Sequence, residues 1–400
     1  MSARPLHVAG RRFDPFARAL RRQVAAFEDG AAAPPLLEDQ WLPLGELRAL
    51  LLDDGALRDG RLDLALVPTD WLPELIADGH VAPLADALPD DWERAWTPSL
   101  RGLQTDADGE VYGAAYHDGP TMLLYRRDLL ERAGIEPPRD WEGFLAAARW
   151  LSEPAAGRYG TVLAGASDGH NDVYDFVAQL AARGGELLDA DGRPAFAGDA
   201  GREALRFLHD LWHVHGVVDP AARGWDSVAS GARFAAGDGA LMVNWAGFAA
   251  LAQAPGSPTR DLVACAPPPG RALNVYWVLV VGAGSRDLPL ARAVARHVAS
   301  ARMDLITAEE GATATRRDSW ADPSVQALAP YYAVLEEAHR GAVTMPRTPR
   351  LPALTTVLSE MAEAAIWHGE DLSTGLTTAA RRAAELLDAS PTAHQGAPSR

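Results

Sequence analysis

The spacing of apolar residues predicts helices and strands that alternate along the first part of the chain. Apolar residues recur at helical spacing between Asp14 and about Glu28, which predicts an amphipathic helix. The run from Leu62 to Pro68 is largely apolar and predicts a fully buried strand, and a new helix is predicted directly after Trp71. This alternation is typical of a parallel sheet flanked by helices.

The same criteria extend the prediction to the rest of the chain. Asp140 is placed to cap the helix that begins at Trp141, and Gly134 ends the helix before it. A Pro- and Gly-rich stretch at 254–287 indicates a path that crosses between two lobes, and residues 389–400 are predicted to be a disordered tail. Further strands are predicted at 110–115, 121–125, 240–244, 262–266 and 276–281, and further helices at 44–52, 127–133, 141–151, 171–183, 200–216, 228–236, 245–253, 289–307, 325–339, 352–368 and 371–387.

Composition narrows the possible partners. At 400 residues the chain is long enough for two lobes. The 54 acidic residues outnumber the 37 basic ones, giving a net charge of −17, which disfavours nucleic acid and anionic lipid as partners. Every basic residue is Arg, so lysine chemistry such as a Schiff base or a phosphate-loop lysine is excluded. The single cysteine, Cys265, excludes intrachain disulfides and thiolate clusters.

Two short motifs that would indicate an enzyme are missing or incomplete in the sequence. There is no His-Glu-x-x-His segment, and the glycines at 282–284 do not complete a dinucleotide fingerprint. His209 and His213 have the i, i+4 spacing of metal ligands, but the helix around them is otherwise amphipathic. We interpret them as a solvated or partly packed face and expect neither a metal nor a cofactor.

Tryptophans and polar residues gather where strands are predicted to end. In open α/β sheets the carboxyl ends of strands face the crevice that binds ligands. Flat aromatic faces with Asp, Asn and Arg side chains suit a polyhydroxylated ligand, because rings pack on C–H groups and each hydroxyl needs a donor and an acceptor. The tryptophans are Trp41, Trp71, Trp225, Trp245, Trp277 and Trp320, and the polar neighbours are Asp70, His117, Asp118, Asp226, Asn244, Asn274, Arg316 and Arg317.

Four segments in a fixed order carry a family resemblance. They are DGEVYGAAYHDGPTMLLYRRDLLERAGIEPPRDW, FVAQLAARGGELLDADGRPAF, FAAGDGALMVNWAGF and GATATRRDSW. Their order resembles that of the extracytoplasmic solute-binding proteins of carbohydrate ABC transporters, the maltose-binding-protein-like family, over roughly residues 60–385. The resemblance is specific to the family but not to one sugar.

The resemblance implies an α/β fold of two lobes of periplasmic-binding-protein type II, each a mixed sheet flanked by helices, with a hinge between them. Lobe 1 would comprise 1–115 and 269–313, and lobe 2 would comprise 116–268 and 314–388. A mono- or oligosaccharide would bind between the lobes by hinge closure without catalysis. The implied ligand contacts, carried over position by position, are Asp70, Trp71, Tyr116, His117, Asp118, Trp225, Asn244, Trp245, Asn274, Trp277, Arg316 and Trp320.

The implied partners are a sugar or polyol and the permease subunits of a transporter, with a monomeric chain and no membrane insertion. The family is periplasmic or extracellular, whereas the first residues lack the apolar core of a secretion signal and a lipid-attachment cysteine. Two alternatives therefore stay open at this point: an unexported cytosolic ligand sensor on the same scaffold, and a glycoside-processing enzyme that uses Asp118 or Asp226.

Overall fold

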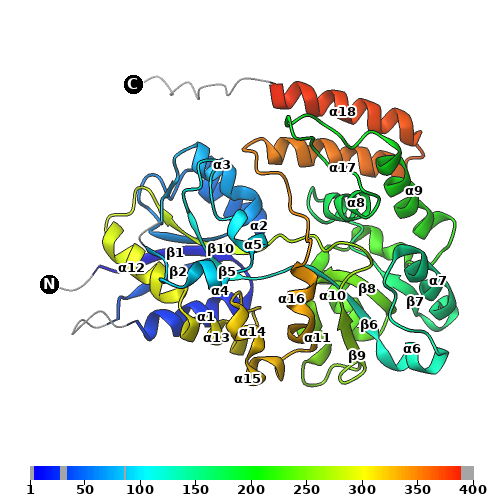
Figure 1. Cartoon of the computed structure of the whole chain (residues 1–400), viewed down its shortest axis with the longest axis horizontal. Coiled ribbons are helices and arrows are strands. Elements are labelled where there is room, and N and C mark those ends of the chain that lie inside the picture. The colour runs from blue at the N-terminus through cyan, green and yellow to red at the C-terminus, as the bar shows by residue number, and fades with distance from the viewer. Residues whose placement is uncertain (1–3, 28–33, 85–86, 389–400) are drawn as a thin grey trace. The chain divides into compact units, whose positions relative to one another are not determined.

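The computed structural model describes residues 4–27, 34–84 and 87–388 (Figure 1). Contacts between Cα atoms divide the chain into two compact units. Unit 1 comprises Met1–Leu163 and Ser227–Pro349, and unit 2 comprises Ala164–Asp226 and Arg350–Arg400. The predicted lobe boundaries stay a prediction, and the predicted tail at 389–400 lies outside the described residues.

Unit 1 contains two mixed sheets. The first follows the order β2-β1-β3-β10-β4, with β5 also paired to β10. Strands β2, β1 and β3 run parallel, whereas β10 is antiparallel to β3, β4 and β5, so the sheet is mixed rather than parallel throughout. The strands are β1 (Leu6–Arg11), β2 (Leu37–Leu42), β3 (Leu64–Pro68), β4 (Val81–Ala82), β5 (Gly113–His117) and β10 (Trp277–Gly282).

The two central strands of this sheet form its buried core. β3 and β10 are buried along their whole length, as continuous apolar runs between covered faces should be. Helices α1 (Asp14–Ala25), α12 (Leu288–Val298) and α13 (Ala301–Glu309) pack together beside it. Shorter elements complete this region: α2 (Leu44–Arg48), a π-turn η1 (Ala49–Asp53), η2 (Thr69–Trp71), α3 (Leu72–Ala77), α4 (Trp92–Ala95) and α5 (Pro98–Gly102).

The second sheet follows the order β7-β8-β6-β9. Strand β6 is antiparallel to β8 and β9, and β7 is parallel to β8. The capping residues act as predicted: Gly134 has a φ of 67°, and the Asp140 side chain accepts a hydrogen bond from Gly143 N. The elements are β6 (Thr121–Arg126), β7 (Tyr159–Val162), β8 (Gly239–Trp245), β9 (Val263–Ala266), α6 (Arg127–Ala133), α7 (Trp141–Leu151), η4 (Pro154–Ala156), α10 (Ser227–Ala236), η6 (Ala246–Phe248) and α11 (Ala249–Gln253).

Two predicted long helices are interrupted. The helix predicted at 289–307 breaks at Ser300, whose backbone is extended and whose carbonyl accepts from Met303 N and Asp304 N to start α13. The helix predicted at 325–339 is wrong as one element, because Pro330 starts a separate turn. That region forms α14 (Arg317–Ala321), α15 (Pro323–Gln326), η7 (Pro330–Val334) and α16 (Leu335–His339).

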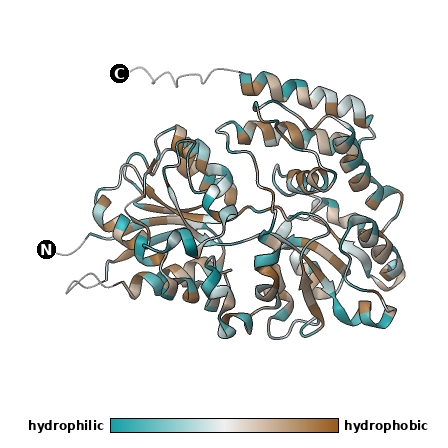
Figure 2. Cartoon of the chain, in the orientation of Figure 1, coloured by the Kyte–Doolittle hydropathy of each residue, from teal (hydrophilic) through white to brown (hydrophobic). Residues whose placement is uncertain are grey.

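Unit 2 is helical in its described part. Its helices are α8 (Asn171–Ala182), α9 (Asp199–His213), α17 (Leu351–Trp367) and α18 (Leu372–Asp388), with a short turn η5 (Pro220–Gly224). Leu205, Leu208 and Leu211 form the buried face of α9. Apolar residues gather along the strands of both sheets and along one side of the surrounding helices (Figure 2). Among the described residues, no helix combines the length and the apolar character that crossing a membrane requires.

Candidate functional site

Most of the predicted site residues lie at strand ends of unit 1, and Trp225 lies in unit 2. Asp70 and Trp71 follow β3 in the turn η2 and are buried. Tyr116 is also buried and donates from its hydroxyl to Phe16 O at 3.3 Å. These placements agree with the expected strand ends.

His117 stands at the end of β5 among aromatic rings. Its imidazole lies edge-on to Phe16 with centroids 5.1 Å apart, and Phe13 lies 6.3 Å away. Trp277, the residue paired with His117 in the sheet register, has its ring 5.3 Å from Phe16. Sequence reasoning missed Phe13 and Phe16 as site candidates. Their one signal is their position at the start of the amphipathic helix that is predicted from Asp14.

The hydrogen bonding of His117 fixes its tautomer. Its Nδ1 accepts from Thr313 N at 2.8 Å, and an amide N–H can only donate, so in the neutral ring Nε2 carries the proton. Burial, helped by the charge of Arg11, lowers the pKa of His117 to about 3. Within the residues that the structure describes, the bond at Nδ1 is the only hydrogen bond of this imidazole. His117 is therefore a neutral, half-buried donor with Nε2–H unused.

Gly247 belongs to a third chain segment that lies next to the His117 ring. A Cβ built on Gly247 would lie 3.7 Å from His117 Cε1 and 3.7 Å from Thr313 Oγ1, which is ordinary van der Waals contact. Residues 117, 247 and 313 come from three segments far apart in the sequence, and Gly247 and Thr313 were not among the predicted contacts. We call His117, Phe13, Phe16, Trp277, Gly247 and Thr313 the His117 neighbourhood.

Asp118, the next residue, belongs through its side-chain hydrogen bond to a different group of residues from those around His117. Its Oδ2 accepts from His339 Nε2 at 2.8 Å, and His339 Nδ1 accepts from Ser99 Oγ at 2.8 Å. The Trp320 ring stacks on His339 with centroids 5.1 Å apart and planes 8° from parallel. Two predicted site residues, Asp118 and Trp320, thus meet through a histidine that was not predicted. Among the described residues, Asp118 Oδ1 is buried without a partner.

Asn274 lies on the segment that leads into β10. Its side chain is fully buried, and within the described residues neither Nδ2 nor Oδ1 has a hydrogen-bond partner. Its backbone N–H donates to Val343 O at 2.8 Å, and the residue pairs with Pro120 in an isolated bridge. Buried amide groups need a partner, so Asn274 requires a water molecule or a ligand hydroxyl.

Asn244 shapes the end of β8. Its Nδ2 donates to Ser230 Oγ at 3.0 Å, and its Oδ1 accepts from Trp245 N at 2.8 Å. The side chain is therefore engaged within the protein and holds the backbone at Trp245, where the strand turns into η6. Trp245 itself is half-buried.

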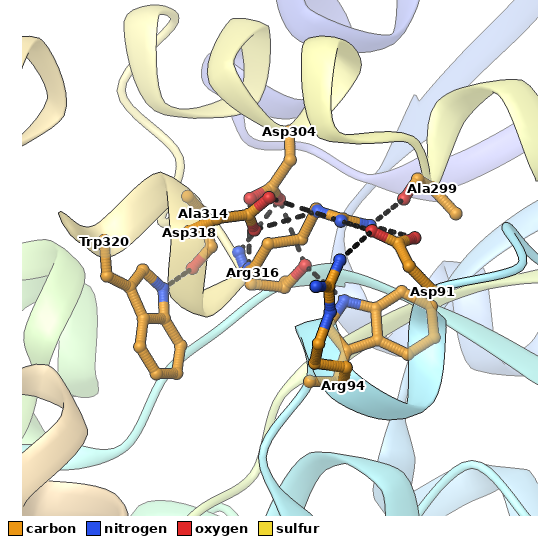
Figure 3. A network of polar contacts seen from close by, with 10 residues as sticks. Asp91, Arg94, Ala299, Asp304, Ala314, Arg316, Asp318 and Trp320 are labelled. Atoms are coloured by element: carbon orange, nitrogen blue, oxygen red, sulfur yellow. Dashed lines mark hydrogen bonds and ion pairs between the residues drawn. The ribbon is translucent and has the colours of Figure 1, made fainter. Parts of the chain in front are cut away.

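Arg316 lies in a closed network (Figure 3). Its guanidinium donates to both oxygens of Asp91, to both oxygens of Asp318 and to Ala299 O, and the side chain is 1% exposed. The bond from Arg316 lowers the pKa of Asp91 below its ordinary value. Asp304 accepts from Thr315 N, Thr315 Oγ1 and Arg316 N at 2.9, 3.0 and 3.0 Å. Every guanidinium nitrogen is occupied, so a ligand contact by Arg316 stays a prediction and needs one of these bonds to break.

Among the described residues, no group of three or more His, Cys, Asp or Glu side chains is placed to hold a metal ion. The chemistry that the His117 neighbourhood offers is recognition: aromatic faces, one fixed neutral donor and nearby buried polar atoms.

A match to a family model identifies the family. A model of the bacterial extracellular solute-binding proteins matches residues 47–304. This chain belongs to that family. The match includes the strands that carry His117, Asn244 and Trp277, and it confirms the resemblance read from the sequence.

Known relatives of this solute-binding protein agree with that assignment. A putative binding protein of Brucella abortus is 28% identical over 150 residues, 37% of this chain and 36% of that protein. The mannitol-binding protein of Pseudomonas aeruginosa is 27% identical over 214 residues, 52% of this chain and 48% of that protein. This chain thus aligns with about a third to a half of these relatives.

The fold is also found among solved structures. The maltose-bound MalE3 of T. maritima matches with a TM-score of 0.84 and 22% identity, over 96% of this chain and 99% of that one. This likeness confirms the predicted fold class, a two-lobed maltose-binding-protein fold built from mixed α/β structure.

Proposed function

We propose that this protein is the solute-binding component of an ABC importer and that it binds a neutral sugar or polyol. The observation that carries the proposal is His117, whose Nε2–H has no hydrogen-bond partner among the described residues and whose ring lies in a cluster with Phe13, Phe16 and Trp277. An oxygen of a polyol can accept this bond while its C–H groups pack on the rings. Membership in the family and the ligand named for the Pseudomonas relative support the same class of ligand.

Asn274 and Asp118 supply the other half of hydroxyl recognition. The Asn274 amide is a donor and an acceptor without partners among the described residues, and Asp118 Oδ1 is a buried acceptor. A hydroxyl donates one hydrogen bond and accepts others, so both groups suit it. In this proposal Asp70, Trp71 and Trp245 are further ligand contacts, and the two predicted lobes close on the ligand about the crossing segments that carry Asp118 and Asn274.

In this proposal the protein catalyses no reaction. It works outside the cytoplasm with permease subunits as partners, and its membership in a family of extracellular proteins supports that location. For the enzyme alternative, Asp118 is a poor general acid candidate because its Oδ2 is bound to His339.

The test is isothermal titration of the full chain with hexitols, hexoses and short oligosaccharides, accompanied by thermal shifts. We expect a neutral polyol or sugar to bind with one site per chain and to raise the melting temperature. Sugar acids and amino sugars of the same size serve as controls and are expected to bind more weakly. No response to any neutral compound, or turnover of an aryl glycoside, would refute the proposal.

A further inference from the structure

Unit 2 contains a histidine pair that the proposed function does not use. His209 and His213 lie one turn apart on α9, with ring centroids 4.6 Å apart and planes inclined by 38°. The spacing alone favoured a packed or solvated face. The hydrogen bonds of the two rings change that interpretation, because they determine which ring nitrogens carry a proton and which carry a lone pair.

Each ring donates one N–H to a group that can only accept. His213 Nε2 lies 2.8 Å from Ile366 O, and His209 Nδ1 lies 2.9 Å from Asp210 Oδ1. A carbonyl or carboxylate oxygen accepts, so these two nitrogens carry the protons. The lone pairs are left on His209 Nε2 and His213 Nδ1. Histidines that bind metals are oriented in this way, by a carboxylate or a backbone carbonyl on the other nitrogen.

The surroundings hold the His213 ring in place and leave it accessible. Trp367 meets His213 edge to face with centroids 5.5 Å apart, and Trp212 supports Trp367 at 4.7 Å. Arg223 covers the Trp367 ring at 4.9 Å and pairs with Glu363. His213 is exposed and the His209 side chain is about a third exposed, so an ion can reach both from solvent.

We propose that His209 and His213 bind one transition-metal ion of the zinc, nickel or copper class. Two imidazoles on one tetrahedral ion, with bonds of about 2.0–2.1 Å, hold their ring centroids about 5 Å apart, close to the separation in unit 2. Imidazole nitrogens select these ions over calcium and magnesium, which prefer oxygen. Water fills the remaining positions, so the ion links two turns at the carboxyl end of α9 and stabilises it. This site is independent of the sugar proposal.

The test is isothermal titration of zinc chloride into the full chain after removal of metals with a chelator. We expect one zinc per chain, and at least about tenfold weaker binding in His209→Gln and in His213→Gln. His215→Gln is the matched control, since it removes a neighbouring histidine outside the pair, and it should bind zinc like the original chain. Magnesium should give no heat.

A second measurement covers the case in which a variant is destabilised. Nitrogen NMR of the imidazoles in the unaltered chain should show zinc shifting His209 Nε2 and His213 Nδ1 and leaving His215 unchanged. Absence of heat at millimolar zinc, equal affinity in all three variants, or zinc shifts confined to other histidines would each overturn the proposal.

Discussion

Two polar neighbourhoods of unit 1 are built from similar residues and differ in how completely their groups are paired. Around Arg316 and Asp304, each guanidinium nitrogen and both carboxylate oxygens have partners within the protein. Around His117, the ring uses one nitrogen and leaves the other as a donor, and the segment before β10 carries Asn274, whose side-chain amide has no partner among the described residues.

The difference separates stability from recognition. A buried polar group without a partner costs free energy, so it persists where something else satisfies it. The closed network has no capacity left for a ligand and should contribute to folding. The open neighbourhood has capacity left and should contribute to binding. The variants below test this division, from the largest expected effect to the smallest.

Asp304→Ala should have the largest effect, and the effect should be on folding. It leaves Thr315 N, Thr315 Oγ1 and Arg316 N without their acceptor in a buried site, which should lower the free energy of unfolding by about 3–5 kcal/mol. Urea denaturation measures this loss. Asp318→Ala is the control, because that partner of Arg316 is 57% exposed and should cost at most about 1 kcal/mol. Equal losses in both variants would contradict the division.

His117→Phe should have the next largest effect, and it should be on affinity. Phenylalanine keeps the ring contacts and removes the Nε2–H donor, so binding of the sugar identified by titration should weaken by about 1–3 kcal/mol. His117→Gln, which retains a donor, should recover part of this loss. A melting temperature that collapses in both variants while affinity persists would make His117 a structural residue.

Protonation gives an independent check on His117. Its folded pKa of about 3 lies below the ordinary value of 6.5, so the unfolded chain binds the extra proton first as the pH falls. This group therefore lowers the free energy of unfolding as the pH falls from about 6.5 to about 3. His117→Phe should lose this contribution, so its stability should fall less steeply with pH in this range than that of the original chain. Sugar affinity itself should stay constant between about pH 5 and pH 8, because the ring is neutral throughout.

The fold was largely predictable because its signals are local. Helices α6 and α7 begin and end where predicted, since Asp140 and Gly134 act within their own turns. Strand β2 was missed because its residues are half-exposed and polar in part, so no apolar run marks it. The break at Ser300 was missed because apolar residues continue on both sides of it.

The site was predictable by residue type but not by pairing. Strand ends indicated His117, Asp118 and Asn274, yet the partner of Asp118 is His339, which is 221 positions away. No spacing rule connects residues that are so far apart in the sequence. Whether the polar atoms of a side chain are all hydrogen-bonded within the protein depends on such distant partners. The sequence therefore gives Arg316 and Asn274 the same prediction, that of a ligand contact. In the structure the Arg316 side chain is hydrogen-bonded at every guanidinium nitrogen, whereas the Asn274 side chain has no partner among the described residues.

Asp175 of unit 2 extends the comparison to a carboxyl group whose charged form is disfavoured in the folded protein. Burial, with the charges of Asp172 and Asp168, raises its pKa to about 8, so the folded chain keeps a proton that the unfolded chain loses. Stability from this group should fall as the pH rises from about 4 to about 8. Asp175→Asn should remove that fall and should be more stable than the original chain at about pH 8. We expect a gain of about 1 kcal/mol, less than the whole pKa shift would give, because the residue is partly exposed and solvent screens its charge.

Urea denaturation as a function of pH measures the effect of Asp175→Asn, and Asp191→Asn, in an exposed turn, is the control. Parallel pH profiles for Asp175→Asn and the original chain would show that the Asp175 charge is satisfied in the folded state.

Gly247→Ala should have the smallest effect and distinguishes open space from packing in the His117 neighbourhood. The added Cβ meets His117 Cε1 and Thr313 Oγ1 at 3.7 Å, so the free energy of unfolding should change by at most about 0.5 kcal/mol. Gly231→Ala is the contrast, because its Cβ would lie 2.6 Å from Phe248 Cδ1 and should cost about 1–3 kcal/mol. If a ligand lies beside His117, Gly247→Ala should weaken sugar binding a few-fold without loss of stability. Unchanged affinity would place the ligand away from Gly247, and a stability loss equal to that of Gly231→Ala would show that the space beside His117 is already filled by the protein.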